Sequence, residues 1–133
     1  MSEETTRDMT LASNVATLFL RRYHRKNFYA HLGREAESLF LPDATLLFNG
    51  NKITSALTIG EFCRSVQQVS SEVVHCDAQI IRRGQVPPIV MTVLTVELDE
   101  SVQDERHVHH TLVLAKTEGL YKIKSAILRH MVM

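Results

Sequence analysis

The sequence is poor in the features that mark secreted and membrane-spanning proteins. It contains 2 cysteines, Cys63 and Cys76, which form neither a C-x-x-C pair nor a dense disulfide framework. Two such thiols in a domain of this size are typical of a reduced, intracellular protein. No stretch approaches the roughly 20 apolar residues that a membrane-spanning helix requires. The first residues are acidic rather than basic, so we expect no secretory signal.

A net charge is also lacking. Lysine plus arginine number 15, as do aspartate plus glutamate, so the formal net charge is zero. No global field therefore draws the chain toward RNA or an anionic membrane, and any RNA contact would be local, weak or indirect. The hydrophobic fraction of 44% is enough for a core. We expect one domain over residues 1–133.

Helical periodicity dominates the first half of the chain. Apolar residues recur every three to four positions from Leu11 to Phe19, which predicts an amphipathic helix. A second, shorter helix is predicted over about 34–40. Thr58 followed by Glu61 three residues later has the pattern of a capping box and predicts the start of a third helix.

Beyond residue 70 the apolar period changes from helical to two. An earlier apolar run over 44–48 is closed by Asn49-Gly50, the strongest short hairpin signal, and 52–54 would be its return strand. Helices that precede strands predict an α+β fold with the helices packed on one face of a sheet. The further predicted strands are 73–81, 89–98, 107–116 and 120–128.

The predicted strands are apolar on both faces. On the strand over 89–98, Met91 and Val93 alternate with Leu94 and Val96. Helices at one end of the chain can cover only one face, and an uncovered apolar face usually marks a protein interface. The alternative is that a curved sheet folds both faces around a single core.

Several short motifs carry a family resemblance. The segment 43–51, Asp-Ala-Thr-Leu-Leu-Phe-Asn-Gly-Asn, resembles the Trp-Asn-Gly-Asn signature of the nuclear transport factor 2-related export proteins, with Phe48 in place of the tryptophan. Glu-Phe at 61–62 and the run at 118–125, Glu-Gly-Leu-Tyr-Lys-Ile-Lys-Ser, are also similar to that family. Arg129 falls where the family has an arginine.

The resemblance implies a nuclear transport factor 2-like cone, in which N-terminal helices pack on a strongly curved, mostly antiparallel sheet. It implies a non-catalytic small subunit without cofactor or metal. The partners it implies are the similar domain of a large messenger-RNA export receptor and the phenylalanine-glycine repeats of nucleoporins. The implied location is the nucleus and nuclear pore, with shuttling to the cytoplasm.

Arg129 is the predicted partner contact that a mutation can test most directly. In the related proteins the arginine at this position pairs with an aspartate of the partner, and a guanidinium among apolar groups needs such a carboxylate. The alternatives are an internal ion pair with Asp77 or Asp99, or simple exposure at the end of the chain. Period-two counting places Arg129 on one face with three residues of its strand, unless a bulge shifts the register: Tyr121, Ile123 and Ile127.

The period-two strand pattern also predicts which histidines could share a metal ion and which residues face a partner. His107 and His109 would share one strand face while His110 points away, so these histidines do not close a zinc site. The pattern is more typical of histidines on the surface or at an interface than of metal ligands. The residues assigned to the partner face are Arg129, His75, Asp77, His109 and Thr111.

Arg82 and Arg83 form a basic connection between two predicted strands. A solvated turn explains them, and a local contact with RNA phosphates is the sharper alternative. 

Two rival functions keep the same fold. A homodimeric import factor that binds a small GTPase would use acids around the mouth of the cone, and the sequence reveals no such cluster. A small-molecule isomerase or dehydratase would need an acid/base pair inside the cone, for which the candidates are Asp43, His75 and Asp77.

Overall fold

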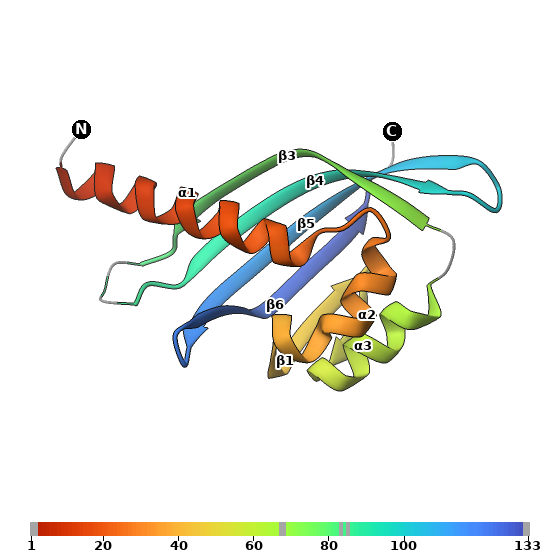
Figure 1. Ribbon diagram of the computed structural model, residues 1–133, viewed down its shortest axis with the longest axis horizontal. Coiled ribbons are helices and arrows are strands. Elements are labelled where there is room, and N and C mark those ends of the chain that lie inside the picture. The colour runs from red at the N-terminus through yellow and green to blue at the C-terminus, as the bar shows by residue number, and fades with distance from the viewer. Residues whose placement is uncertain (1–2, 67–68, 83, 85, 132–133) are drawn as a thin grey trace.

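The computed structural model describes residues 3–66, 69–82, 84 and 86–131. In this part of the chain three helices lie against one face of a single six-stranded sheet (Figure 1). The helices are α1 (Glu3–Tyr23), α2 (Phe28–Leu39) and α3 (Ala56–Ser65). The strands are β1 (Phe40–Phe48), β2 (Asn51–Thr54), β3 (Val69–Ile80), β4 (Ile89–Asp99), β5 (Asp104–Thr117) and β6 (Leu120–His130).

The strand order is β2-β1-β6-β5-β4-β3. β1 and β6 are parallel, and the other neighbouring strands are antiparallel, so the sheet is mixed. The long strands bend around the helices, with α1 along β3 and the α2–α3 pair over β1 (Figure 1). The predicted α+β cone with a curved, mostly antiparallel sheet is confirmed.

The hairpin predicted at Asn49-Gly50 is also confirmed. Phe48 pairs with Asn51, and both turn residues have positive φ, 48° at Asn49 and 88° at Gly50. Two consecutive left-handed residues define a turn whose twist matches that of the flanking strands. The local sequence therefore determines this element without help from the rest of the fold.

The second and third helices begin earlier than predicted. α2 starts at Phe28, and its pattern was obscured by Gly33, a poor helix former that the packing requires. A Cβ at position 33 would lie 2.5 Å from Cγ of Arg64 on α3, so only glycine permits this approach. At α3 the capping box predicted at Thr58 is wrong, because Ser55 is the N-cap and its hydroxyl accepts a hydrogen bond from the Thr58 N–H.

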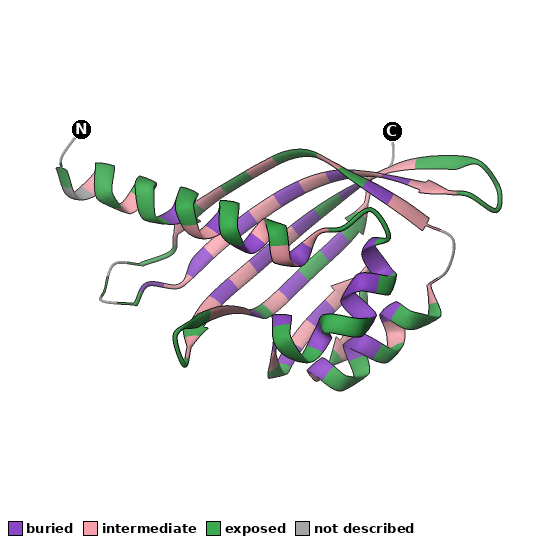
Figure 2. Cartoon of the chain, viewed as in Figure 1, coloured by how far each residue is buried: buried purple, intermediate pink, exposed green. Residues whose placement is uncertain are grey.

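The core lies between the helices and one face of the sheet, here called the inner face. On β4, buried residues alternate strictly with partly exposed ones over most of the strand (Figure 2). Curvature therefore does not bury both faces of the strand. The largest fully buried side chains are Tyr23, Phe28, Phe40, Leu32, Leu39, Leu46, Ile59, Ile89, Met91, Leu112, Leu114 and Ile123.

A bulge in β6 changes which residues accompany Arg129. The pairing with β5 shifts between Leu114↔Ile123 and Val113↔Ser125, which leaves Lys124 without a partner. Ile123 is fully buried on the inner face, whereas Ile127 and Arg129 are exposed on the opposite side. This bulge is the exception stated with the prediction: Ile127 shares the face of Arg129 as expected, whereas Tyr121 and Ile123 do not, because one extra residue inverts the alternation.

Candidate partner interface

The face of the sheet opposite the helices, here called the outer face, carries apolar side chains that the rest of the described chain leaves partly or fully exposed. Ile127 on β6 is 42% exposed and Val74, at the bulge of β3, is 57% exposed. Further apolar residues of β4 and β5 lie between them in the sheet: Val90, Leu94, Val96, Leu98 and Val113. A continuous apolar surface of this kind is the usual signature of a protein interface.

One transverse row of the outer face contains three residues assigned to a partner. His75 pairs with Leu94, Leu94 with His109, and His109 with Arg129. The row thus carries two imidazoles and one guanidinium around a central leucine. Residues directly opposite on neighbouring strands have Cβ atoms roughly 5 Å apart, so these four side chains form one contiguous strip.

The adjacent row contains the other two assigned residues. Asp77 pairs with Thr92, Thr92 with Thr111, and Thr111 with Ile127. Residues from three different strands, far apart in the sequence, therefore lie on one surface. Their role in binding a partner stays a prediction.

Arg129 has no ion-pair partner among the described residues. Asp99 instead lies 3.9 Å from Arg106, and hydrogen bonds from Ser101 lower the pKa of its carboxyl. Asp77 is three strands away, or about 14 Å at the usual strand spacing, which is beyond ion-pair distance. The internal ion pair, one of the two alternatives, is thus absent from the structure. Arg129 is exposed, as the second alternative expects, and its guanidinium is free to meet a carboxylate from outside.

The remaining histidines follow the predicted alternation. By alternation along β5, His107 and His109 lie on the outer face, whereas His110 is completely buried on the inner face. Within the described ranges no group of three or more histidine, cysteine or acidic residues is placed to hold a metal ion. Asp43, His75 and Asp77, the residues considered for catalysis, are all exposed and do not converge in the cone.

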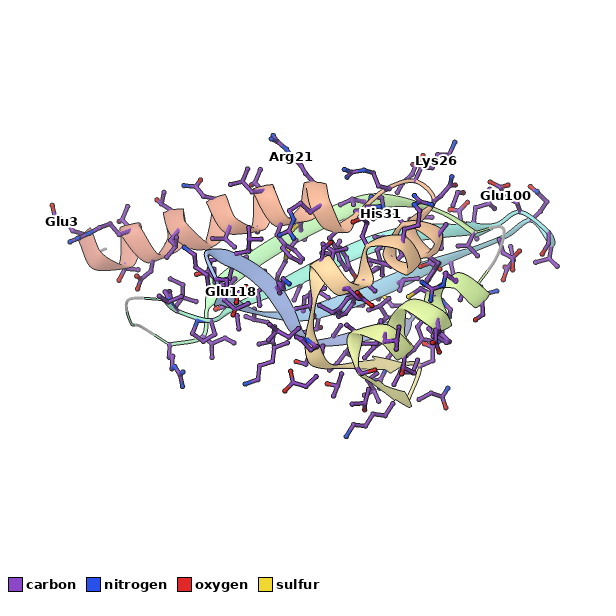
Figure 3. The ribbon with its side chains drawn as sticks, turned by 60° about the horizontal axis from the view of Figure 1, so that its bottom comes forward. Glu3, Arg21, Lys26, His31, Glu100 and Glu118 are labelled. Atoms are coloured by element: carbon purple, nitrogen blue, oxygen red, sulfur yellow. The ribbon has the colours of Figure 1, made fainter. Side chains whose placement is uncertain are left out.

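Arg82 is exposed just after β3, and Arg83 lies outside the described residues. Other exposed cations lie near the C-terminal end of α1, where Arg21 and Lys26 project away from the sheet (Figure 3).

The structure reveals a pocket that the sequence analysis missed. It has a volume of about 300 Å³ and is lined by Tyr29, Phe48, Phe62, Val66, Val69, Glu97, Asp99, Arg106 and His130.

Glu97, only 4% exposed, accepts a 2.6 Å hydrogen bond from the Tyr29 hydroxyl, and its other oxygen lies 3.6 Å from Nε2 of His130. Burial raises the pKa of the Glu97 carboxyl to about 7, against the opposing effects of Tyr29 and Arg106. Counting by two from Ile89 would have placed this acid on the inner face.

A second concavity runs along α1. It has a volume of about 440 Å³ and is lined by Leu11, Val15, Leu18, Phe19, Arg22, Val86, Pro87, Lys116, Gly119, Leu120 and Tyr121. Leu18 on the helix and Leu120 on the β5–β6 hairpin are more than half exposed there. Arg22 is held at the rim by hydrogen bonds to the carbonyls of Tyr121 and Ser38.

No helix among the described residues is long and apolar enough to cross a membrane.

Comparisons with known proteins agree with this architecture. Nuclear transport factor 2 from Cryptosporidium parvum superposes with a TM-score of 0.70 at 15% identity, over 90% of this chain and 94% of that one. A chain of the Mex67:Mtr2 complex with a bound Sac3N peptide gives 0.64 at 14% identity, over 90% and 99%. A putative scytalone dehydratase from Novosphingobium aromaticivorans gives 0.69 at 13%, over 96% and 89%. At these identities the likeness shows the fold alone.

A search of curated proteins found no match. The family model of the nuclear transport factor 2 (NTF2) domain, however, matches residues 15–130, which is most of the chain. The chain belongs to the NTF2 domain family.

Proposed function

We propose that this chain is the non-catalytic small subunit of a messenger-RNA export receptor. It pairs through its outer face with the NTF2-like domain of the large subunit and supports passage of mRNA through the nuclear pore. The observation that carries the proposal is the uncovered apolar outer face with the unpaired cation Arg129 on it. The proposed location is the nucleus and the nuclear pore, with shuttling to the cytoplasm.

The geometry of the outer face suits a second sheet better than a peptide. Two sheets stack face to face about 10 Å apart, with side chains of both interdigitating. Leu94 would then lie near the centre of the contact, with His75 and Arg129 on either side of it. Burial of Arg129 would be costly unless the partner supplied a carboxylate, which gives the pairing its selectivity.

The groove along α1 is the proposed contact for phenylalanine-glycine repeats. Its walls are apolar at Leu18 and Leu120, and the ring of Phe19 lies at its base under Arg22. An aromatic side chain is large enough to bury much of this exposed surface, whereas the neighbouring glycine allows the repeat backbone to approach closely. RNA contact through Arg82 is secondary in this proposal.

Purification of the chain from its native cell tests the pairing. A large subunit with an NTF2-like domain should co-purify in a one-to-one ratio, and Arg129→Asp should abolish its recovery while the chain stays soluble. Lys26→Asp is the matched control, because Lys26 is an exposed cation that projects away from the sheet beyond the end of α1. Retention of the large subunit by Arg129→Asp would contradict the proposal.

A homodimeric import factor that binds a small GTPase is the second candidate. The pocket places two acids, Glu97 and Asp99, at one end of the sheet, where the sequence alone indicated no acidic cluster. Arg106 partly neutralises the charge of Asp99, and the Tyr29 hydroxyl donates a hydrogen bond to Glu97. The pocket therefore presents less negative charge than two free carboxylates would. A stable symmetric dimer of the isolated chain in light scattering would favour this candidate over the export subunit.

An isomerase or dehydratase is a third candidate, with acid/base residues other than those considered from the sequence. Glu97 and His130 are the titratable pair that faces the pocket, and a carboxyl that titrates near neutrality suits proton transfer. We favour the non-catalytic role because the exposed outer face has no explanation in a monomeric enzyme. Turnover of a small carbonyl substrate that is lost in Glu97→Gln would reverse this preference.

A further inference from the structure

Asn49 makes three hydrogen bonds to the residues immediately before and after Arg129 in the chain. Its backbone N–H donates to the carbonyl of Leu128 at 2.9 Å. Its side-chain oxygen accepts from the backbone N–H of His130 at 2.8 Å, and its side-chain nitrogen lies 2.9 Å from Nδ1 of the His130 ring. The residues immediately before and after Arg129 are therefore both held by one asparagine from the β1–β2 turn.

These bonds occur where the regular ladder ends. The last paired residues of β1 and β6 are Phe48 and Leu128. Beyond them β1 turns away, and the N–H of His130 would face solvent on that edge without the amide of Asn49. The side chain thus replaces a missing strand for one further residue.

The same bonds determine the tautomer of the His130 ring. A backbone N–H can only donate, so the oxygen of Asn49 faces it and the amide nitrogen faces the ring. Nδ1 must then accept, which places the proton of the neutral imidazole on Nε2, toward the Glu97 carboxyl 3.6 Å away. His130 is therefore held on the inner side of β6 while Arg129 is directed outward.

We infer that Asn49 is a positioning residue for the partner interface, which orients the guanidinium of Arg129 on the outer face by holding Leu128 and His130. The opposite edge of the same strand end is held independently, since the N–H of Met131 donates to the carbonyl of His107 at 2.9 Å. The inference rests on the proposed pairing function. It adds a second reason for asparagine at this turn, beyond its tolerance of positive φ.

The test is a double-mutant cycle between Asn49→Gly and Arg129→Ala, measured as affinity for the purified NTF2-like domain of the receptor that co-purifies with the chain. Glycine removes the side chain without straining a residue whose φ is 48°. We expect Asn49→Gly to weaken binding about tenfold in the parent and less than about twofold in the Arg129→Ala background, because the two residues act as one unit. Asn51→Gly is the matched control, since Asn51 is an exposed asparagine at the other end of the turn; we expect its affinity to stay within about twofold of the parent.

Two readouts separate positioning from simple destabilisation. Nitrogen-15 NMR of the free chain should show His130 protonated on Nε2 in the parent and in Asn51→Gly, with that preference lost in Asn49→Gly. Hydrogen exchange at the His130 amide should accelerate only in Asn49→Gly. Equal loss of affinity in both backgrounds of the cycle, or no loss, would overturn the inference while leaving the pairing intact. A parent chain that binds no NTF2-like domain would overturn the proposed function and the inference with it.

Discussion

The hydroxyl of Tyr23 lies 2.8 Å from Nδ1 of His110, in the middle of the core. The other ring nitrogen lies 2.9 Å from the hydroxyl of Thr95, so both polar atoms of a completely buried imidazole are satisfied. The rings of Tyr23 and Phe28 pack edge-on against the same imidazole. α1, β4 and β5 are thus tied together by a polar contact inside an apolar environment.

This buried imidazole predicts a loss of stability in mild acid. Burial first, and then the neighbouring His24, His109 and His130, lower the pKa of His110 from 6.5 to about 3. The folded state therefore binds fewer protons than the unfolded state, and the stability that His110 contributes above pH 6.5 declines as pH falls toward 3. At pH 5 the loss should be about 2 kcal/mol. Urea unfolding of the parent and of His110→Gln between pH 5 and 8 measures it, and equal pH slopes for the two chains would contradict the assignment.

Glu97 should show the opposite pH dependence. Burial raises the pKa of this carboxyl from 4.5 to about 7, so its contribution is complete below pH 4.5 and is lost as pH rises through 7. Glu97→Gln keeps an acceptor for the Tyr29 hydroxyl and removes the buried charge. We expect a melting temperature several degrees above that of the parent at pH 8, and no gain at pH 5. An equal change at both pH values would show that ionisation of Glu97 is not the cause.

Gly33 should tolerate no larger residue. A methyl group there would meet the side chain of Arg64 at 2.5 Å and its backbone nitrogen at 3.2 Å, so α2 and α3 would have to separate. Gly33→Ala should destabilise the fold by about 1–3 kcal/mol although alanine favours helix. Chemical denaturation measures this change. Gly84→Ala is the control, because nothing lies within 4 Å of a methyl group at that position.

Leu94 lies at the centre of the row between His75 and His109 and is only partly buried in the single chain. Leu94→Arg should leave the melting temperature of the free chain within about 2 °C of the parent, since a long side chain can extend into solvent. The same change should abolish pairing, because an additional cation without a carboxylate opposite it would be buried in the contact. Sedimentation of the mixed subunits checks this result. Val86→Arg, which alters an exposed apolar residue of the α1 groove, should pair normally.

Local chemistry explains why much of the fold could be predicted. The positive φ values at Asn49 and Gly50 are properties of two adjacent residues, so the hairpin follows from the sequence. Period-two alternation likewise placed His75 and Asp77 on one face of β3 and separated His109 from His110 on β5. The fold class followed from the order of these elements.

Where the prediction was wrong, distant contacts compete with local preference. Gly33 weakens the helical signal of α2, yet it is required by Arg64 from another helix. Ser55 rather than Thr58 caps α3, with its backbone N–H bonded to the carbonyl of Ala44 on β1. The bulge at Lys124 arises from pairing with β5 and cannot be counted from β6 alone.

By itself, then, the sequence determined the elements, the family and the candidate residue Arg129, because these depend on short-range pattern and on motifs. Only the tertiary structure decided which face Arg129 occupies, that no described acid pairs with it, and that Glu97 and His130 meet in a pocket. Such facts depend on strand register and on groups brought together from distant positions. A shift of one residue inverts every side chain beyond it, and that inversion decides which residues of β6 the outer face presents.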